Sequence, residues 1–166
     1  MDKFSYVDTV DSGEYNFGDK LDNQEIRDSL NTLSTISYRY IDFENTEYNF
    51  FQDCFDNNDI AEYFSFMNML TTYPLNTLFS CKEKDWHLYS NDYFNDTRFR
   101  NLVNKSLEQE SNLKVECAPM FYHFALYTNQ GASREKNVKS PRIYFFIGSN
   151  AIIYPLFYDP YHEINP

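Results

Sequence analysis

Glycine is scarce in this sequence, and so are the motifs that depend on it. The 166 residues include four glycines, and neither GxxxxGK[ST], GxGxxG nor GxSxG occurs among them. The HExxH pattern and the EF-hand loop are missing too. These absences argue against nucleotide-cradling loops, serine hydrolases and zinc peptidases. We therefore expect no cofactor and no metal.

Long apolar runs and paired cysteines are also lacking. The longest apolar stretches, 143–147 and 151–158, have the length of strands and fall far below the roughly 18 residues of a membrane span. The first residues carry no signal-peptide pattern. The three cysteines are widely spaced and form no CxxC, which favours buried thiols over a disulfide framework or a zinc site. The sequence thus predicts a cytoplasmic protein without membrane contact.

Aromatic residues and negative charge are in excess. The chain holds 16 Phe, 15 Tyr and one Trp, enough to form the core of a folded protein rather than a disordered chain. Its net charge of −11 is uneven, because residues 1–60 contain 14 acidic and 4 basic side chains, whereas residues 111–166 contain 4 and 5. Nucleic-acid binders gain most of their affinity from Lys and Arg at phosphates. Direct nucleic-acid binding is therefore not expected, and a basic protein is the predicted partner.

Apolar periodicity predicts about three helices in the N-terminal part. The first follows a capping signal at Asp22 and extends to residue 33. The second is capped by Asn58 or Asp59 and stops before Pro74. The third is capped by Asn95 or Asp96. The apolar stripe of the second helix consists of Ile60, Phe64, Met67 and Leu70, and that of the third of Phe99, Leu102, Val103 and Leu107.

Alternating patterns predict strands at 36–40, 113–118, 120–128, 142–147 and 151–158. Residues 1–20 are expected to form an acidic arm or edge hairpin, and residues 82–96 a connecting loop around a buried Trp86. The expected architecture is a single α+β domain, 1–166, with the helices packed on a C-terminal antiparallel β-meander. Between its strands, residues 129–141 predict a mobile basic loop containing Arg134, Lys136 and Lys139.

Four residues form a candidate catalytic set: His123, Arg142, Asp159 and His162. His123 lies within a predicted strand, and His162 follows the last strand, where Asp159 could hold its imidazole. An acid, a base and a cation are what a metal-independent ribonuclease needs. The structural alternative is that His123 is a satisfied core residue and that Asp159 caps a turn.

The acidic N-terminal third contains a second candidate set, in which carboxylates are interspersed with tyrosines. We expect it to dock on a basic partner through electrostatic complementarity, although solubility alone would also explain the charge. This leads to the hypothesis of a non-catalytic accessory protein, such as an anti-defence inhibitor of a nucleic-acid-handling enzyme. The predicted contact residues are Tyr38, Tyr40, Asp42, Glu44, Glu47, Asp53, Asp56 and Asp59.

The C-terminal segments SPRIYFF (140–146) and IIYPLFYDPYHEI (152–164) resemble the ends of small uncharacterised bacterial and mobile-element proteins. Those proteins end in a proline–arginine strand, a turn, an apolar strand and DPxH. The resemblance to these proteins implies no known activity. A phage or mobile-element origin belongs to the accessory-protein hypothesis, which the acidic charge, the aromatic excess and the absent catalytic motifs motivate. The final hairpin also resembles that of RelE-like toxins, which implies RNA cleavage as the alternative function, using His123, Arg142 and His162. A structural component that pairs through an exposed strand edge is a third possibility, and the oligomeric state stays open.

Overall fold

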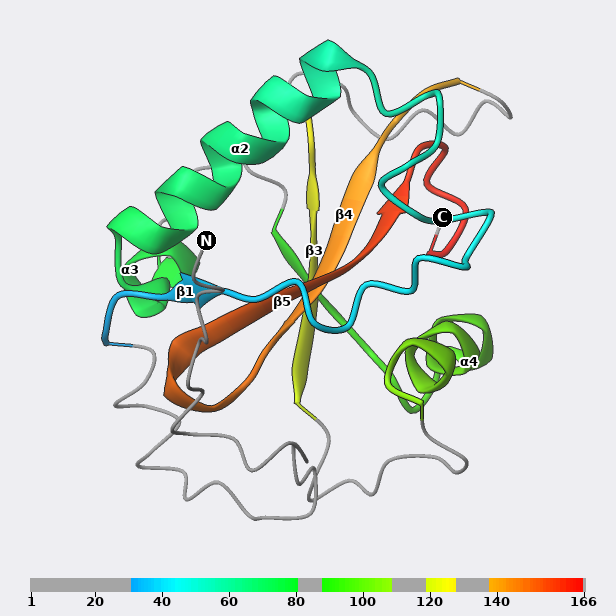
Figure 1. Cartoon of the computed structure of the whole chain (residues 1–166). Helices are drawn as coiled ribbons and strands as arrows, with labels where there is room; N and C mark the ends of the chain where they lie inside the picture. The colour runs from blue at the N-terminus through cyan, green and yellow to red at the C-terminus, as the bar shows by residue number, and fades with distance from the viewer. Residues whose placement is uncertain (1–30, 81–87, 109–118, 128–137, 166) are drawn as a thin grey trace, which may run out of the picture.

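The computed structural model describes residues 31–80, 88–108, 119–127 and 138–165. This part of the chain has the α+β fold that the sequence predicts (Figure 1). Its elements, in chain order, are β1 (Thr35–Ile36), α2 (Asn57–Thr72), α3 (Leu75–Ser80), β2 (Tyr89–Asn91), α4 (Thr97–Ser106), β3 (Met120–Ala125), β4 (Arg142–Ile147), a short 3-10 turn (Ser149–Ala151) and β5 (Ile152–Asp159).

The five strands form one sheet in the order β1-β5-β4-β3-β2. β1 pairs with β5 in parallel, and the other neighbours are antiparallel. Between β4 and β5 the register shifts, because Tyr144 pairs with Phe157 while Phe145 pairs with Pro155. Leu156 is the extra residue. A proline beside this bulge is tolerated because the ladder is already interrupted there.

The segment between β1 and α2 covers the edge of β5. The Ser37 amide donates to the Ile153 carbonyl at 2.9 Å, and the Tyr158 amide donates to the Tyr48 carbonyl at 3.0 Å. β5 is much longer than its partner β1, so without this segment its backbone groups would be left unpaired. The same segment carries most of the acidic residues discussed below.

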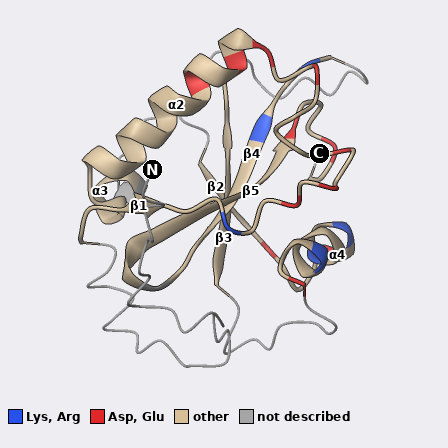
Figure 2. Ribbon diagram, viewed as in Figure 1, with Lys and Arg blue, Asp and Glu red and all other residues tan. Residues whose placement is uncertain are grey.

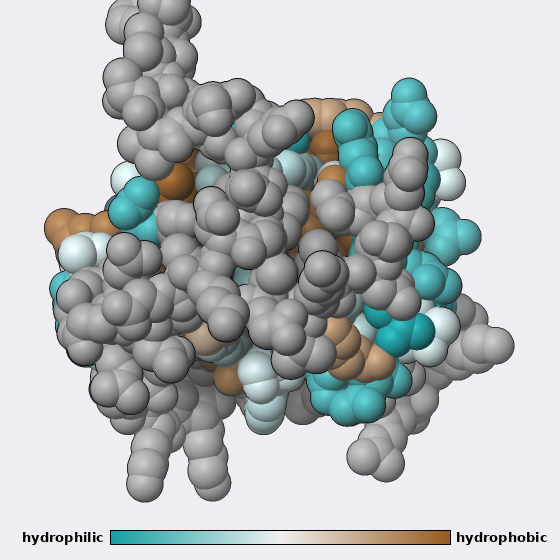
Figure 3. Space-filling model, turned by 90° about the horizontal axis from the view of Figure 1, so that it is seen from below, coloured by the Kyte–Doolittle hydropathy of each residue, from teal (hydrophilic) through white to brown (hydrophobic). Residues whose placement is uncertain are grey.

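The helices lie on both faces of the sheet. Tyr63, Met67 and Leu70 of α2 and Leu75 and Leu78 of α3 join one apolar cluster, and α4 joins the other through Phe99 and Val103. Strand β4 contributes alternately to the two clusters, in agreement with the two-residue period of a strand. Figure 1 shows α2 and α3 on one side of the sheet and α4 on the other. Seen from below, the hydrophobic residues of the described part appear as separate areas among hydrophilic ones (Figure 3).

Helix α2 ends before Pro74 as predicted, but its cap and its buried face differ from the prediction. Asp56 is the N-cap, and Asp59 completes a capping box from inside the helix. The buried face consists of Asp59, Tyr63, Met67 and Leu70. Phe64, predicted to be buried, is 60% exposed. The stripe is shifted because its first member is a carboxylate, which a search for apolar residues passes over.

Helix α4 confirms its prediction. The Asp96 carboxylate accepts a hydrogen bond from the Phe99 amide at 2.9 Å. Phe99, Val103 and Leu107 are buried, and Leu102 is half-buried. The side chain of an N-cap aspartate accepts a hydrogen bond from an amide that the helix itself leaves unpaired. Both the cap and the apolar stripe of α4 therefore agree with the prediction.

Two other predictions need correction. The strand predicted at 36–40 is limited to Thr35–Ile36, after which the chain turns to cover β5. The loop predicted at 82–96 contains β2, an edge strand that pairs with β3.

Several predictions fall outside the described residues. They are the arm 1–20, most of the helix 22–33, Trp86, the strand 113–118 and most of the loop 129–141. Of the predicted first helix, Asn31 lies in a turn and Thr32 in a bend, and Leu33 is in neither a helix nor a turn. Within the described part of the chain, no helix has the length and apolar character needed to cross a membrane.

Candidate functional site

The predicted catalytic residues come together at one end of the sheet. Arg142, at the start of β4, pairs in register with Asp159 of β5. His123 of β3 pairs with Tyr144 of β4, and their ring centroids are 5.1 Å apart. The ring of His162, from the turn after β5, lies 6.0 Å from that of His123. Two strands and a turn thus build one histidine–arginine cluster, formed by His123, Arg142 and His162.

His123 is held by the edge strand. Its Nδ1 lies 2.8 Å from Oδ1 of Asn91, and its ring stacks on Tyr89 with centroids 5.6 Å apart. With the carboxamide oxygen facing the ring, Nδ1 carries the proton and Nε2 keeps its lone pair. Burial lowers the pKa of His123 to about 3, and the neighbouring His162 and Arg142 add to the shift. His123 is therefore a neutral base at pH 7.

His162 is the accessible member of the cluster. It is half-buried and adopts a left-handed backbone with φ of 54°. This region is uncommon for residues other than glycine. Burial, with a smaller contribution from the charge of Arg142, lowers the pKa of His162 to about 4. Both imidazoles are therefore neutral under physiological conditions.

Arg142 supplies a buried positive charge. Its Nη1 donates to the Ser140 carbonyl at 3.1 Å, to Ser140 Oγ at 3.2 Å and to the Pro141 carbonyl at 3.1 Å. Burial lowers its pKa, but a guanidinium stays protonated in proteins. Its charge disfavours protonation of the two histidines, as their lowered pKa values show.

Asp159 stabilises the turn rather than the imidazole. Its Oδ1 accepts from the Tyr161 amide at 3.3 Å, and its Oδ2 accepts from the Ile164 amide at 2.8 Å. Burial raises the pKa of this carboxyl group. Of the two alternatives that the sequence left open, the bonds of Asp159 to backbone amides agree with the turn cap and not with a pairing to His162, because the chain after Pro160 turns back over the carboxylate.

Access limits what the histidine–arginine cluster can do. His123 and Arg142 are only 6% and 4% exposed, so in the described part of the chain His162 is the member of the cluster that a substrate could contact. Its chemistry is that of a neutral base next to a fixed positive charge. Among the described residues, no group of three or more His, Cys, Asp and Glu could hold a metal ion.

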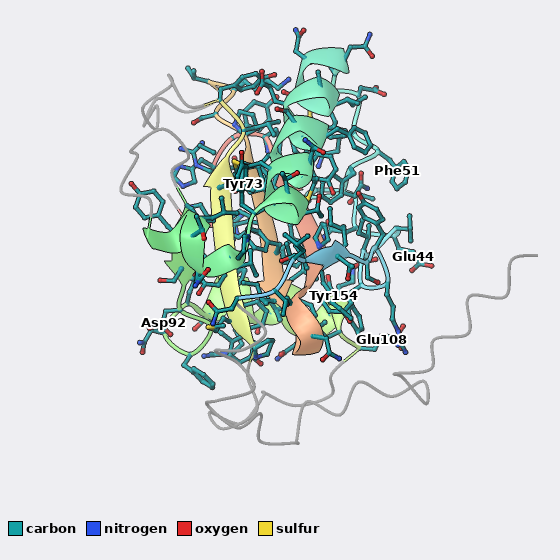
Figure 4. All side chains as sticks on the ribbon, turned by 90° about the vertical axis from the view of Figure 1, so that its left-hand side faces the viewer. Glu44, Phe51, Tyr73, Asp92, Glu108 and Tyr154 are labelled. Carbon is teal, nitrogen blue, oxygen red and sulfur yellow. The ribbon has the colours of Figure 1, made fainter. Side chains whose placement is uncertain are left out.

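The second site is on the segment between β1 and α2. Phe43 and Phe51 are 64% and 67% exposed, although their rings contact each other with centroids 5.5 Å apart. Figure 4 shows Phe51 and Glu44 on the same side of the molecule, and Figure 2 shows acidic residues along this segment. We call it the acidic–aromatic surface and define it by its exposed residues Tyr38, Phe43, Glu44, Glu47, Phe51 and Asp53.

Four of the predicted contact residues are not part of this surface. Asp59 is buried, Asp42 forms an ion pair with Lys105 at 3.1 Å, and Asp56 caps α2. Tyr40 packs against the sheet, with its ring centroid 5.2 Å from that of Tyr154. Phe43 and Phe51 were not among the predicted contact residues. They could have been recognised as apolar residues between acidic ones in a segment that has neither helical nor strand periodicity.

Asp59 lies at the centre of a buried polar network. Its carboxylate accepts from Lys139 Nζ at 2.6 Å, from the Tyr127 hydroxyl at 2.5 Å and from the Tyr158 hydroxyl at 2.7 Å. Lys139 also contacts Asp56 at 2.9 Å. Lys139 was predicted to belong to a mobile basic loop, but it is tied to α2 by these bonds. Arg134 and Lys136 lie outside the described residues.

Cys54 is the cysteine within the described residues. It is free and half-buried, and burial is the main cause that raises the pKa of its thiol. A raised thiol pKa lowers the fraction of reactive thiolate. The sequence predicted buried thiols, and Cys54 is a free thiol that is half-buried, while Cys81 and Cys117 lie outside the described part.

Comparison with known proteins identified no relative of the chain. No family model matches the sequence, and neither does any curated protein or solved structure.

Proposed function

We propose that this protein is a non-catalytic binding protein that docks its acidic–aromatic surface on a basic partner protein. The observation that carries the proposal is the exposed pair Phe43 and Phe51, which projects among carboxylates. Aromatic residues are enriched in protein interfaces. Two phenylalanines that share a surface with charged side chains are therefore better accounted for by a partner than by folding.

The charge of this region supports a basic partner. Residues 31–80 contain seven acidic side chains and one basic side chain. Three of the seven, Asp42, Asp56 and Asp59, are neutralised by lysines. Glu44, Glu47 and Asp53 form no ion pair with the described residues. Carboxylates that remain uncompensated on one surface attract a positively charged partner and accelerate its association.

A phage or mobile-element setting is supported by the acidic charge, the aromatic excess and the absence of catalytic motifs in the sequence. It supports a cytoplasmic accessory role in which the protein inhibits a nucleic-acid-handling enzyme, for example one of a defence system. On such an enzyme, carboxylates at Glu44 and Glu47 would occupy the places of phosphates.

The test is affinity capture with the tagged protein at low and high salt, followed by mass spectrometry. The wild type is compared with Glu44→Lys and Glu47→Lys, and Glu62→Lys serves as the control. Glu62 is an exposed residue of α2 outside the surface, and its substitution changes the net charge equally. We expect a stoichiometric basic protein that the two surface variants lose and the control retains. Retention by all variants would contradict the proposal.

A second candidate function, cleavage of RNA, is supported by one observation, the convergence of His123, Arg142 and His162. A neutral imidazole can accept the proton of a 2′-hydroxyl as its oxygen attacks the phosphorus, and a guanidinium can stabilise the charge of the phosphorane; the imidazolium so formed can return the proton to the 5′-oxygen when its bond to phosphorus breaks. On this candidate, His162→Ala abolishes RNA cleavage and growth arrest without changing the circular dichroism spectrum. Activity that survives in the folded variant would contradict it.

A further inference from the structure

The acidic–aromatic surface is organised before any partner binds. Asp42 Oδ1 accepts from the Glu44 amide at 3.0 Å, and Asn45 Oδ1 accepts from the Glu47 amide at 2.9 Å. Asn49 Oδ1 accepts from the Phe51 amide at 2.7 Å. These side-chain bonds fix successive turns of the segment. A surface that is already ordered loses little conformational entropy when it binds.

The chain around these turns is anchored to the sheet. The Tyr158 amide of β5 donates to the Tyr48 carbonyl at 3.0 Å. The Tyr48 ring is buried, and its hydroxyl accepts from Nη2 of Arg98 on α4. The exposure of Phe43 and Phe51 is therefore imposed by a fixed backbone.

The two rings present a specific geometry to solvent. They are tilted by 37° at a centroid distance of 5.5 Å. This arrangement leaves much of both rings accessible, since each is more than half exposed. Glu44 directly follows Phe43 in the chain, and Glu47 lies three residues after Glu44. A planar cation could contact a ring face and a carboxylate at the same time.

We propose that Phe43 and Phe51, together with Glu44 and Glu47, form a receptor for an arginine side chain of the basic partner. This inference rests on the proposed function and names the chemistry that the surface recognises. A guanidinium is planar and weakly hydrated, stacks on aromatic rings and binds carboxylates through two N–H groups. The ammonium of lysine is compact and strongly hydrated, so it gains less from the rings.

Arginine is already used in this way next to the surface. The Arg98 guanidinium lies 5.5 Å from the centroid of the Tyr48 ring, and that of Arg39 lies 5.5 Å from the Tyr40 ring. Arg98 also donates to the Glu163 carbonyl at 2.7 Å. Both arginines of this region are thus engaged with tyrosines. Among the described residues, neither Arg39 nor Arg98 stacks on Phe43 or Phe51, which leaves the two rings to an arginine of the partner.

The test uses the full-length protein and two synthetic peptides of equal length and charge, one with arginine and serine alternating and one with lysine and serine. Fluorescence anisotropy at low salt measures both affinities. We expect the arginine peptide to bind about fivefold more tightly, in keeping with the strength of cation–π contacts at exposed sites. In Phe43→Leu and Phe51→Leu this preference falls below about twofold. Phe94→Leu, a variant of an exposed phenylalanine beside α4, retains it.

The outcomes separate this inference from the proposed function. Equal binding of the two peptides, or a preference that persists in both leucine variants, overturns the arginine receptor. In either case salt-sensitive binding that Glu44→Lys weakens leaves the proposed function standing. Absence of salt-sensitive binding of either peptide overturns both.

Discussion

The rings of His123 and His162 lie 6.0 Å apart, next to the buried guanidinium of Arg142. Neither histidine is paired with a carboxylate in the described structure, because Asp159 binds the amides of the C-terminal turn. The arrangement keeps both imidazoles neutral and makes the fold sensitive to acid. The contact between the His123 and His162 rings also packs the C-terminal turn against the sheet, independently of any activity of the histidine–arginine cluster.

Stability should decrease as the pH falls below about 6.5. In the unfolded chain a histidine binds its proton near that pH, whereas the folded protein holds the pKa of His162 at about 4 and that of His123 at about 3. Between these values the unfolded state binds more protons, so the free energy of unfolding declines with falling pH. The raised pKa of Asp159 acts in the opposite direction.

The measurement is urea unfolding at pH 7.5 and pH 5 of the wild type and of His162→Gln. Comparing the two proteins isolates the histidine from Asp159, which both retain. The loss of stability between the two pH values should be smaller in His162→Gln. Equal losses would show that His162 is not held neutral by the fold.

Asn91→Ala should remove the hydrogen bond that fixes His123 in one tautomer. The Nδ1–H of His123 loses its acceptor at 2.8 Å, and the loss of one hydrogen bond costs about 1 kcal/mol of stability. Long-range ¹⁵N–¹H NMR reports which ring nitrogen carries the proton. We expect Nδ1 to be protonated in the wild type and the proton to shift partly to Nε2 in the variant. An unchanged tautomer would contradict this role of Asn91.

Asp59→Ala should be strongly destabilising. It removes the shared acceptor of Lys139, Tyr127 and Tyr158. Breaking a buried ion pair by removal of one partner costs about 3–5 kcal/mol, and the half-exposed Lys139 places the expected loss near the lower end. Asp53→Ala, a change of an exposed aspartate on the acidic–aromatic surface, should change the urea midpoint little. Similar midpoints for the two variants would refute the network.

Phe99→Ala should lower the free energy of unfolding strongly and Phe43→Ala only slightly, because Phe99 belongs to the core and Phe43 to the surface. Phe99 is fully buried against Phe121 and Tyr144, and truncation of a core phenylalanine costs about 3–5 kcal/mol. Phe43 is exposed, and its truncation should change the free energy of unfolding by less than about 1 kcal/mol. A comparable loss in both variants would mean that the Phe43–Phe51 pair supports the fold rather than a partner.

The parts of the fold that could be predicted are those with a strong apolar pattern. The bounds of β4 agree with the prediction because five apolar residues follow Arg142, and the stripe of α4 is correct because Phe99, Val103 and Leu107 repeat at helical spacing. Strand β2 was missed because Tyr89-Ser90-Asn91 is polar and becomes a strand only by pairing with β3.

The candidate sites depend on contacts between distant residues, which limits prediction from sequence. Their residue types could be recognised, but the cluster of His123, Arg142 and His162 results from strand register. Asp59 has the same residue type as the exposed Asp53. Its burial depends on Lys139, Tyr127 and Tyr158, which come from other elements. Local sequence carries no sign of such partners.

The most direct test of the central claim is the affinity of the captured basic partner, after purification, for the wild type, Glu44→Lys and Glu62→Lys. Isothermal titration at low and high salt measures it. We predict that Glu44→Lys weakens binding about tenfold at low salt, that the difference shrinks at high salt, and that Glu62→Lys stays near the wild type. Equal affinities for all three proteins at both salt concentrations would contradict the claim that the acidic–aromatic surface is the binding site.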